Sequence, residues 1–397
     1  MFQSLRSAFQ KKAVGASTPA ALPIFGITPT ITGQNVTSEN AMRVPAVKCA
    51  VSLISETTGG LPVKLHDRET REVEKDHPAY KLIHDEANPW TSAQVLREEL
   101  TTDALLRGHG FALVIRNSLG EPLELHRLDP GAVQVETDDF TGEPTYHVQL
   151  KDGRHSYQFT DILHIKAFGG VAPITLGREA IGLSLAFEAH IAKLFGNGAS
   201  PGGIITAPKT MSDEAKKNLK ASWLDSHSGP KAGGVALLDE GMAYQQIAMT
   251  LTDAQFAENR LEQIREIARV FGVPPTMLFE LTRGTWSNTE EMARQFLQVT
   301  LKPWLSEWTW AYARCLLAPE ERRELYIEFN TNDLTTTDTA ARATAYGQYR
   351  SMGAMTANEV RGGLNLPPRP DGEALENPYI STGATTRPAT AESIPND

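Results

Sequence analysis

Cysteine is scarce in this sequence of 397 residues, which contains only Cys49 and Cys315. Neither lies in a CxxC motif or beside histidines at metal-ligand spacing, so a disulfide framework and a cysteine-based zinc site are excluded. Basic charge is also limited, because 38 Lys and Arg face 48 Asp and Glu, for a net charge of −10. Tight nucleic-acid binding depends on many Lys and Arg contacts to phosphates, so only a looser relation to DNA stays open.

Long apolar runs are absent as well. No stretch approaches the roughly 18 consecutive apolar residues that a membrane-spanning helix requires. The first residues, MFQSLRSAFQKKAVG, carry basic charge but lack the apolar segment of a secretory signal. With 41% hydrophobic and 22% charged residues, the composition is that of an ordinary soluble protein. We therefore expect a protein of the cytoplasm, or of something assembled there, without a membrane partner and with both cysteines reduced and buried.

The first half of the chain predicts an extended arm followed by an α+β unit. Residues 13–37 are rich in Ala, Thr, Pro and Gly and carry no charge, which is typical of an extended arm that lies on a neighbour. A helix is expected from Ser38 through Ser55. Beyond it, strand patterns separated by Gly, Pro and Asp alternate with helical patterns up to about residue 170. The expected strands are FALVIRN, LELHRL, AVQVET, TYHVQL and DILHIKA.

Four helix starts carry the capping-box pattern, in which a Ser or Thr side chain and a Glu or Gln three residues later bond to each other's backbone N–H groups. The first of these helices is expected to continue through Arg107. The four pairs are Thr91 with Gln94, Thr252 with Gln255, Ser287 with Glu290, and Thr356 with Glu359.

Two long helical patterns, at about 178–195 and 252–272, flank a smaller insert at 197–251 that reads as strands around a short helix capped by Ser212. The first long helix is apolar on most of its circumference, which predicts that it is packed on most sides. Its apolar residues include Ile181, Leu185, Phe187, Ile191 and Leu194.

The longest helix is expected at 289–318, with a length on the order of 43 Å and a kink near Pro303. One face of it carries Leu297, Leu301, Trp304, Leu305, Trp308 and Tyr312. The tryptophan group Trp304, Trp308 and Trp310 is interpreted as core rather than as a platform for bases. A strand at 325–330, a helix around 340–352 and a polar, mobile tail from 381 complete the chain.

Candidate catalytic and metal motifs are weak. Ser184, in the segment GLSLA, resembles the nucleophile of a hydrolase, but it lies inside a helical pattern rather than at a strand-to-helix turn. The Gly-rich run at 196–203 lacks the Lys of a phosphate-binding loop. The run His84-Asp85-Glu86 has no matching metal-ligand cluster. We therefore predict no catalytic residues, no metal and no cofactor, with a serine hydrolase built on Ser184 as the alternative.

The stretch FGVPPTMLFELTRGTWSNTEEM, which begins at Phe271, interrupts two strong helical patterns. Pro274 and Pro275 end the first helix, because proline cannot donate the next helical hydrogen bond. Connections between packed helices are usually short, and this one includes a tryptophan. Its polar, hydroxyl-rich sequence with one arginine suits a surface that contacts a polymer without holding it. The residues in question are Thr282, Arg283, Gly284, Thr285, Trp286, Ser287 and Asn288.

This stretch, extended as FGVPPTMLFELTRGTWSNTEEMARQFLQVTLKPWL, resembles the portal proteins of tailed bacteriophages of the HK97 type. Three other segments are similar to the same family: GREAIGLSLAFEAHIAKLFGNGASPGGIITAP, TANEVRGGLNLPP and NPWTSAQVLREELTTDALLRGHGFALVIRN. The resemblance covers roughly residues 39–378. Trp286 stands where the family has a smaller aromatic residue.

The resemblance implies a non-enzymatic ring of about twelve copies at one capsid vertex, through which double-stranded DNA is packaged and ejected. It implies the terminase large subunit, a head-tail adaptor and the major capsid protein as partners, and a place in the virion after assembly in the host bacterial cytoplasm. The loop at Thr282 to Asn288 would line the DNA channel. The implied parts are an arm (1–38), an α/β wing (39–175), two stem helices (176–196 and 252–272) around an αβ clip (197–251), a tunnel-loop region (273–288), the long kinked helix (289–318), a wing strand with a reduced crown (319–380) and a tail (381–397).

Charge on the second stem helix agrees with a channel wall. Its four acidic residues slightly outnumber its three arginines, so a ring of such helices offers no basic track to hold DNA. A generic structural oligomer, in which the tryptophan-rich helix is only core, remains open beside the hydrolase. The acidic residues are Asp253, Glu258, Glu262 and Glu266, and the basic ones are Arg260, Arg265 and Arg269.

Overall fold

The structure is a computed structural model. It divides into two units, residues 1–330 and 331–397, which are described separately. The division follows the last strand of the first unit. The structure describes residues 29–196, 204–206, 212–219, 242–245, 253–280, 289–331, 339–364 and 366–375.

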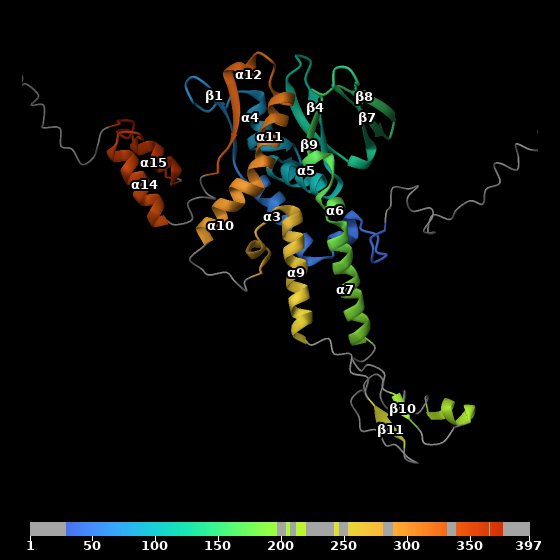
Figure 1. The fold of residues 1–397 in the computed structure, drawn as a ribbon. Helices are drawn as coiled ribbons and strands as arrows, with labels where there is room; N and C mark the ends of the chain where they lie inside the picture. Colours follow the sequence, from blue (N-terminus) through green and yellow to red (C-terminus); the bar gives the residue numbers. More distant parts are fainter. Residues whose placement is uncertain are drawn as a thin grey trace, which may run out of the picture. The chain divides into compact units, whose positions relative to one another are not determined.

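A three-stranded antiparallel sheet is the centre of the first unit (Figure 1). Strand β4 (His109–Arg116) lies between β5 (Pro122–Leu128) and β9 (Ile162–Lys166). Helix α5 (Ala93–Arg107) packs beside β4 and ends at Gly108, whose φ of 90° places it in the left-handed region. Glycine adopts that conformation without steric cost, so the turn from helix to strand is tight.

The start of α5 differs from the expected capping box. Ser92, not Thr91, is the N-cap, and its Oγ accepts a hydrogen bond from the N–H of Val95 at 3.1 Å. Thr91 instead belongs to the short strand β3 (Thr91–Ser92). The strand pairing moves the helix start by one residue, and Gln94 bonds to Glu98 rather than back to the cap.

A second antiparallel sheet packs its apolar face on the first. It consists of β6 (Val133–Thr137), β7 (Pro144–Leu150) and β8 (Gly153–Tyr157) in that order. Strand β8 was not expected, because its alternating pattern is polar and only half-buried. The shared core consists of Phe111, Leu128, Tyr146, Val148 and Ile162.

The expected helix from Ser38 to Ser55 is in fact two helices, α2 (Ser38–Ala41) and α3 (Pro45–Gly60). Proline at the first position of α3 explains the break, because it starts a helix readily and cannot continue one. After α3 the chain forms β1 (Val63–Asp67), which pairs antiparallel with β12 (Leu325–Phe329) near the end of the unit. Smaller elements complete this region: α4 (Pro78–His84), β2 (Glu86–Asn88) and 3₁₀ turns at Pro130–Ala132 and Phe168–Gly170.

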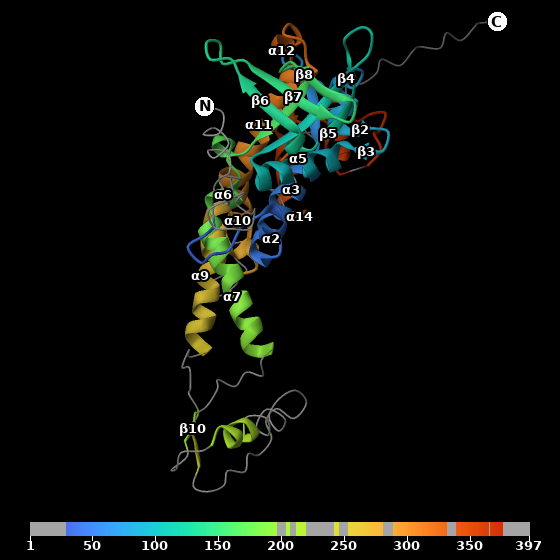
Figure 2. The same cartoon turned by 90° about the vertical axis from the view of Figure 1, so that its right-hand side faces the viewer.

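Two long helices run side by side away from the sheets (Figures 1 and 2). They are α7 (Arg178–Gly196), preceded by the single turn α6 (Pro173–Leu176), and α9 (Asp253–Phe271). Both helices agree with the expected patterns. No helix among the described residues combines the length and apolarity that crossing a membrane would need.

The longest expected helix is divided into α10 (Thr289–Gln295), a π-helical turn (Phe296–Leu301) and α11 (Lys302–Leu316). The π turn lies just before Pro303, whose ring nitrogen has no hydrogen to donate to the preceding turn. Trp308 is fully buried, and its Nε1 donates to Thr101 Oγ1 at 3.0 Å. The core interpretation fails for Trp310, which is 58% exposed because it lies on the opposite side of α11.

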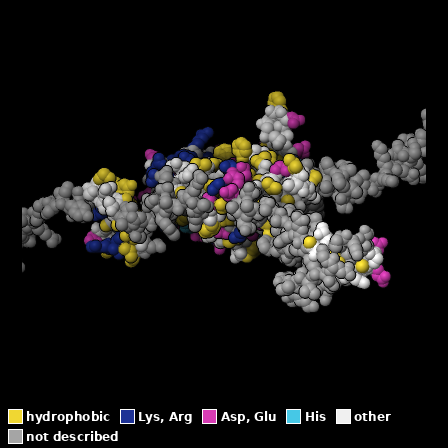
Figure 3. Space-filling model, turned by 60° about the horizontal axis from the view of Figure 1, so that its bottom comes forward, with side chains coloured by type: hydrophobic (Ala, Val, Ile, Leu, Met, Phe, Trp, Pro, Cys, Tyr) yellow, Lys and Arg dark blue, Asp and Glu magenta, His cyan; other side chains and the backbone are white. Residues whose placement is uncertain are grey.

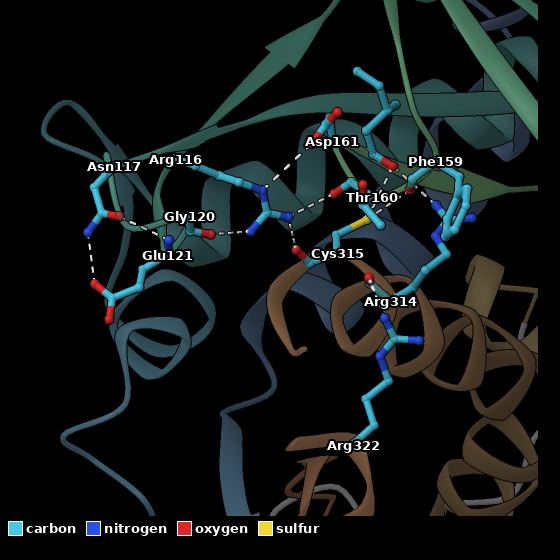
Figure 4. A network of polar contacts seen from close by, with 11 residues as sticks. Arg116, Asn117, Gly120, Glu121, Phe159, Thr160, Asp161, Arg314, Cys315 and Arg322 are labelled. Atoms are coloured by element: carbon cyan, nitrogen blue, oxygen red, sulfur yellow. Dashed lines mark hydrogen bonds and ion pairs between the residues drawn. The ribbon is translucent and has the colours of Figure 1, made fainter. Parts of the chain in front are cut away.

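Arg116 fastens the end of α11 to the central sheet (Figure 4). Its guanidinium donates to the carbonyls of Cys315 at 2.7 Å and of Thr160 at 3.0 Å, and pairs with Asp161 at 3.6 Å. The last carbonyls of a helix have no partner within it and carry partial negative charge, so a cation at this position satisfies and stabilises them. Cys315 itself is buried, as expected, and its Sγ lies 3.2 Å from the carbonyl of Ile162.

In the insert between α7 and α9, the structure describes β10 (Ile204–Thr206) paired antiparallel with β11 (Ala243–Gln245), and a helix over 213–219. Ser212 caps that helix as expected, accepting from the N–H of Ala215 at 3.3 Å. Thr252 lies outside the described residues, so the expected capping box of Thr252 with Gln255 stays a prediction.

The second unit contains α14 (Thr339–Ser351) and α15 (Ala357–Gly363). The fourth capping box is confirmed. The N–H of Glu359 donates to Thr356 Oγ1 at 3.1 Å, and the N–H of Thr356 donates to a carboxylate oxygen of Glu359 at 2.6 Å. The polar tail from residue 381 lies outside the described residues.

Candidate functional site

The predicted channel loop, Thr282 to Asn288, lies outside the described residues, as does the capping serine Ser287. Its role therefore stays a prediction. The structure describes both flanks of the loop, which end at Glu280 and resume at Thr289. These flanks and the two long helices make up the candidate site.

The motif FGVPP forms a defined corner between α9 and the loop. Gly272 has a φ of 64°, and the N–H of Val273 donates back to the carbonyl of Ala268 at 2.9 Å. This left-handed glycine at the helix end confirms that α9 stops where the sequence indicated. Pro274 and a 3₁₀ turn (Pro275–Leu278) then lead to Phe279, which has a φ of 62° and is 82% exposed.

The last described residue before the loop is anchored electrostatically. The side chain of Glu280 is almost fully buried, and one of its carboxylate oxygens lies 3.3 Å from Nη2 of Arg265 on α9. A buried carboxylate is stable only with a cation or hydrogen-bond donors close by. The start of the loop is therefore held to the helix that precedes it.

Charges on the C-terminal half of α9 are paired with one another. Arg265 lies 3.3 Å from Glu262, and Arg269 lies 3.2 Å from Glu262 and also contacts Glu266. These pairs join residues three and seven positions apart, which share one side of a helix. Across the face shown in Figure 3, Lys and Arg side chains lie close to Asp and Glu side chains. The charges of Arg265 and Arg269 on α9 are thus already compensated.

An apolar groove of about 290 Å³ lies between α3, α7, α9 and the corner before the loop. Helix α7 contributes Phe187 and Ile191, and α9 contributes Ile264 and Ile267. Two charged residues, Glu188 and Arg260, also line it, together with Val44, Pro45, Ala46, Cys49, Ser184, Gln263, Leu278 and Phe279. Cys49 was expected to be buried but is only partly so.

Ser184 does not have the surroundings of a catalytic nucleophile. It lies within α7, and its Oγ donates to the carbonyl of Ala180, one turn earlier, at 3.1 Å. The other partner is Gln263 Oε1 at 3.5 Å, which is an amide and cannot act as a general base. This is the ordinary hydrogen bond of a helical serine. The serine-hydrolase alternative therefore has no support in the site geometry.

In the candidate metal-binding run His84-Asp85-Glu86, the side chains of His84 and Glu86 are bonded to other residues. His84 directs Nδ1 to the carbonyl of Val63 at 2.8 Å, while Glu86 pairs with Lys81 at 2.6 Å. Within the described ranges, no three His, Cys, Asp or Glu side chains are grouped so that they could hold a metal ion.

One titratable cluster was not anticipated. His164 on β9 lies 3.0 Å from His109 Nδ1 and 3.0 Å from the hydroxyl of Tyr146. Burial, and secondarily the charge of Lys166, lowers the pKa of His164 to about 2, and burial also lowers the pKa of His109. Both imidazoles are therefore neutral at physiological pH and act as part of the core where the two sheets meet.

Sequence reasoning missed the Arg265–Glu280 pair and the groove, because both depend on residues far apart in the chain. It also assigned no role to Gly182. This helical glycine leaves room for Thr30, whose Cγ2 would lie 2.6 Å from any added Cβ. A glycine inside a strongly helical pattern often indicates that another part of the chain packs closely against the helix, and the sequence alone contains this signal.

Comparison with known proteins identifies the family of this arrangement. The sequence profile of the family described as phage portal protein matches residues 45–365. The chain is 29% identical to the portal protein of Enterobacteria phage HK97 over 352 residues, which cover 85% of this chain and 82% of that protein. It is 31% identical to a probable portal protein of Streptomyces phage phiC31 over 369 residues, covering 86% and 78% respectively.

The fold matches solved structures as well. A chain in the neck of a native gene transfer agent particle, determined with C12 symmetry, superposes with a TM-score of 0.56 at 23% identity, covering 84% of this chain and 94% of that one. The mixed helix and sheet fold expected from the resemblance is thereby confirmed, and so is the family named from the residues around FGVPP.

Proposed function

The chain belongs to the phage portal protein family, and we propose that about twelve copies form a ring at one capsid vertex through which double-stranded DNA enters and leaves. Family membership supports the ring. The observation in the molecule itself that carries the channel is the paired charge of Arg265 and Arg269 on α9, which Glu262, Glu266 and Glu280 compensate.

The physical reason is the steep dependence of DNA affinity on charge. Each additional phosphate contact multiplies the affinity, so a ring with several free cations per copy would hold DNA in place. A wall of paired charges allows a duplex to slide. In this scheme Arg283 is the single arginine of the predicted loop, and the buried Glu280 fixes the point from which the loop projects.

The parts of the fold take the following roles in the proposal. The two sheets with α5 form the wing, α7 and α9 form the stem, and the insert at 197–251 forms the clip. The clip meets the terminase large subunit during packaging and the head-tail adaptor afterwards, while the wing meets the major capsid protein. The ring is part of the virion and assembles in the host bacterial cytoplasm.

The proposed role is that of a conduit and not of an enzyme. This is supported by the helical hydrogen bond of Ser184, whose side-chain partner among the described residues is Gln263. A generic structural oligomer is the remaining alternative, and it differs in one observable respect: its rings would form without admitting duplex DNA.

The test is the DNA content of particles assembled with loop variants. Arg283→Ala and Trp286→Gly are expected to leave rings intact while altering the amount of DNA packaged or retained. Leu119→Ala, at an exposed position beside the sheets, is the matched control and is expected to package normally. Unchanged DNA content in both loop variants would reject the loop assignment.

A further inference from the structure

The amino-terminal arm is fastened to one side of α7. Thr30 packs against Gly182, and the N–H of Ile31 donates to a carboxylate oxygen of Glu179 at 3.0 Å. Thr30 also closes a turn with Gln34, since its Oγ1 accepts from the N–H of Gln34 at 3.0 Å. These contacts fix the backbone at Thr30 and Ile31 against α7. The side chain of Ile31 nevertheless stays 94% exposed.

The apolar groove lies on the other side of the same helix. Ile191, which lines it, follows Gly182 by nine residues, and at about 3.6 residues per turn this is roughly two and a half turns. Ser184 and Phe187, two and five positions after Gly182, also lie on the side of α7 opposite to Gly182. The exposed side chain of Ile31 therefore lies over one face of α7, and the apolar groove lies on the opposite face.

We propose that Ile31 of one copy occupies the groove of the next copy. This inference rests on the proposed ring and names the contact that closes it. Rings are built from head-to-tail interfaces, in which two different surfaces of each subunit meet. An arm and a groove on opposite faces of α7 are such a pair, and the contact can repeat from copy to copy.

A neighbouring copy suits the groove better than the other possible occupants. The arm of the same copy is held on the wrong side of α7 by Gly182 and Glu179. The arm is uncharged from residue 13 to 37, so it brings no unpaired charge into an apolar groove. A small apolar ligand would fill the groove without involving Ile31, and the experiment separates that case.

Native Cys49 makes the contact directly measurable, because it lines the groove and is partly accessible. In Ile31→Cys, mild oxidation or a short bismaleimide is expected to join the introduced thiol of one copy to Cys49 of the next, giving a ladder of covalent multimers on a denaturing gel. Cys315 is buried and does not compete. The double variant Ile31→Cys with Cys49→Ser, and Leu119→Cys alone, are the controls and are expected to give no ladder.

Electron micrographs of the same samples separate the possible failures. Rings that form but give no ladder, with either reagent, overturn the arm-and-groove contact and leave the proposed function standing. A product linked only within one chain also overturns it. Absence of rings in the unmodified protein would reject the proposed function itself. As a second test, Ile31→Asp is expected to reduce the fraction of protein in rings, whereas Ile31→Val is expected to preserve it.

Discussion

Arg265 and Glu280 are fifteen residues apart in the chain and form an ion pair at 3.3 Å across the FGVPP corner. The arginine belongs to α9 and the glutamate is the last described residue before the predicted loop. Because the carboxylate is buried and the guanidinium is only partly exposed, this pair is screened less than the surface pairs further along the helix. It couples the position of the loop to the helix that we assign to the channel wall.

Removing this pair is expected to destabilise the corner. Arg265→Ala takes the guanidinium away from the buried carboxylate of Glu280, which should cost about 1–3 kcal/mol of unfolding free energy. Hydrogen exchange at Phe279 and Glu280 should increase. The matched control is Arg269→Ala, whose side chain is 62% exposed and whose loss should change stability by less than about 1 kcal/mol. Equal effects of the two variants would contradict the anchoring role.

A second prediction concerns Arg97, which is buried in the first unit. Its guanidinium donates to the carbonyls of Gly59 and of Ile83, each at 2.7 Å. These carbonyls lie at the ends of α3 and α4, so one cation joins two helix carboxyl termini.

Arg97→Met is therefore expected to lower the unfolding free energy by about 2–4 kcal/mol, because both carbonyls lose a charged donor without gaining access to water. Urea titration monitored by tryptophan fluorescence measures the change. Arg43→Met, at an exposed arginine paired with Glu39, should have an effect below about 1 kcal/mol. A similar loss in both variants would show that charge, and not helix-end bonding, is responsible.

Sequence reasoning predicted most of the elements but not how they meet. The helix ends at Gly108 and Gly272, and the capping box at Thr356, depend on a few neighbouring residues, so local patterns were enough to identify them. Strand β8 was missed because its residues are polar and only half-buried, and its pairing with β7 is what defines it.

The errors share a physical cause. Trp310 is two positions from Trp308, so the two lie on opposite sides of α11, and the tertiary packing covers only the side of Trp308. Likewise, the contact of Thr30 with Gly182 and the pair formed by Arg265 and Glu280 require a fold before they can be seen. The family resemblance predicted the fold, whereas the candidate channel loop is still known from its sequence alone.

A third prediction concerns the stability of the fold at acidic pH. The pKa of His164 is lowered by burial to about 2, from about 6.5 in an unfolded chain. Above pH 6.5 the histidine is neutral in both states, and its full contribution to stability is present. As the pH falls from 6.5 towards 2, the unfolded state takes up the proton first, so stability is lost.

Between pH 7.5 and pH 5 this amounts to about 2 kcal/mol, and the lowered pKa of His109 acts in the same direction. Urea titrations at several pH values should show a smaller loss in His164→Gln than in the unmodified protein. His190→Gln, at an exposed histidine on α7, is the control variant. If the unfolding free energy changed with pH equally in all three proteins, the contribution assigned to His164 would be contradicted.

A fourth prediction concerns Gly182. Alanine normally stabilises a helix interior relative to glycine by about 1 kcal/mol. Here the added methyl would meet Thr30, so Gly182→Ala is expected to release the arm, and limited proteolysis should cleave it faster. Gly347→Ala, in α14 where an added Cβ meets nothing within 4 Å, should leave the cleavage rate unchanged. Slower cleavage of Gly182→Ala than of the unmodified protein would show that the arm does not pack there.

The central claim is that copies of this chain assemble around a hole wide enough for a DNA duplex. Electron microscopy of the purified full-length protein tests it most directly. The account predicts annular particles of about twelve subunits with an open centre, with the predicted loop facing that opening. A compact monomer that stays single at high protein concentration, with the loop enclosed by its own chain, would contradict it.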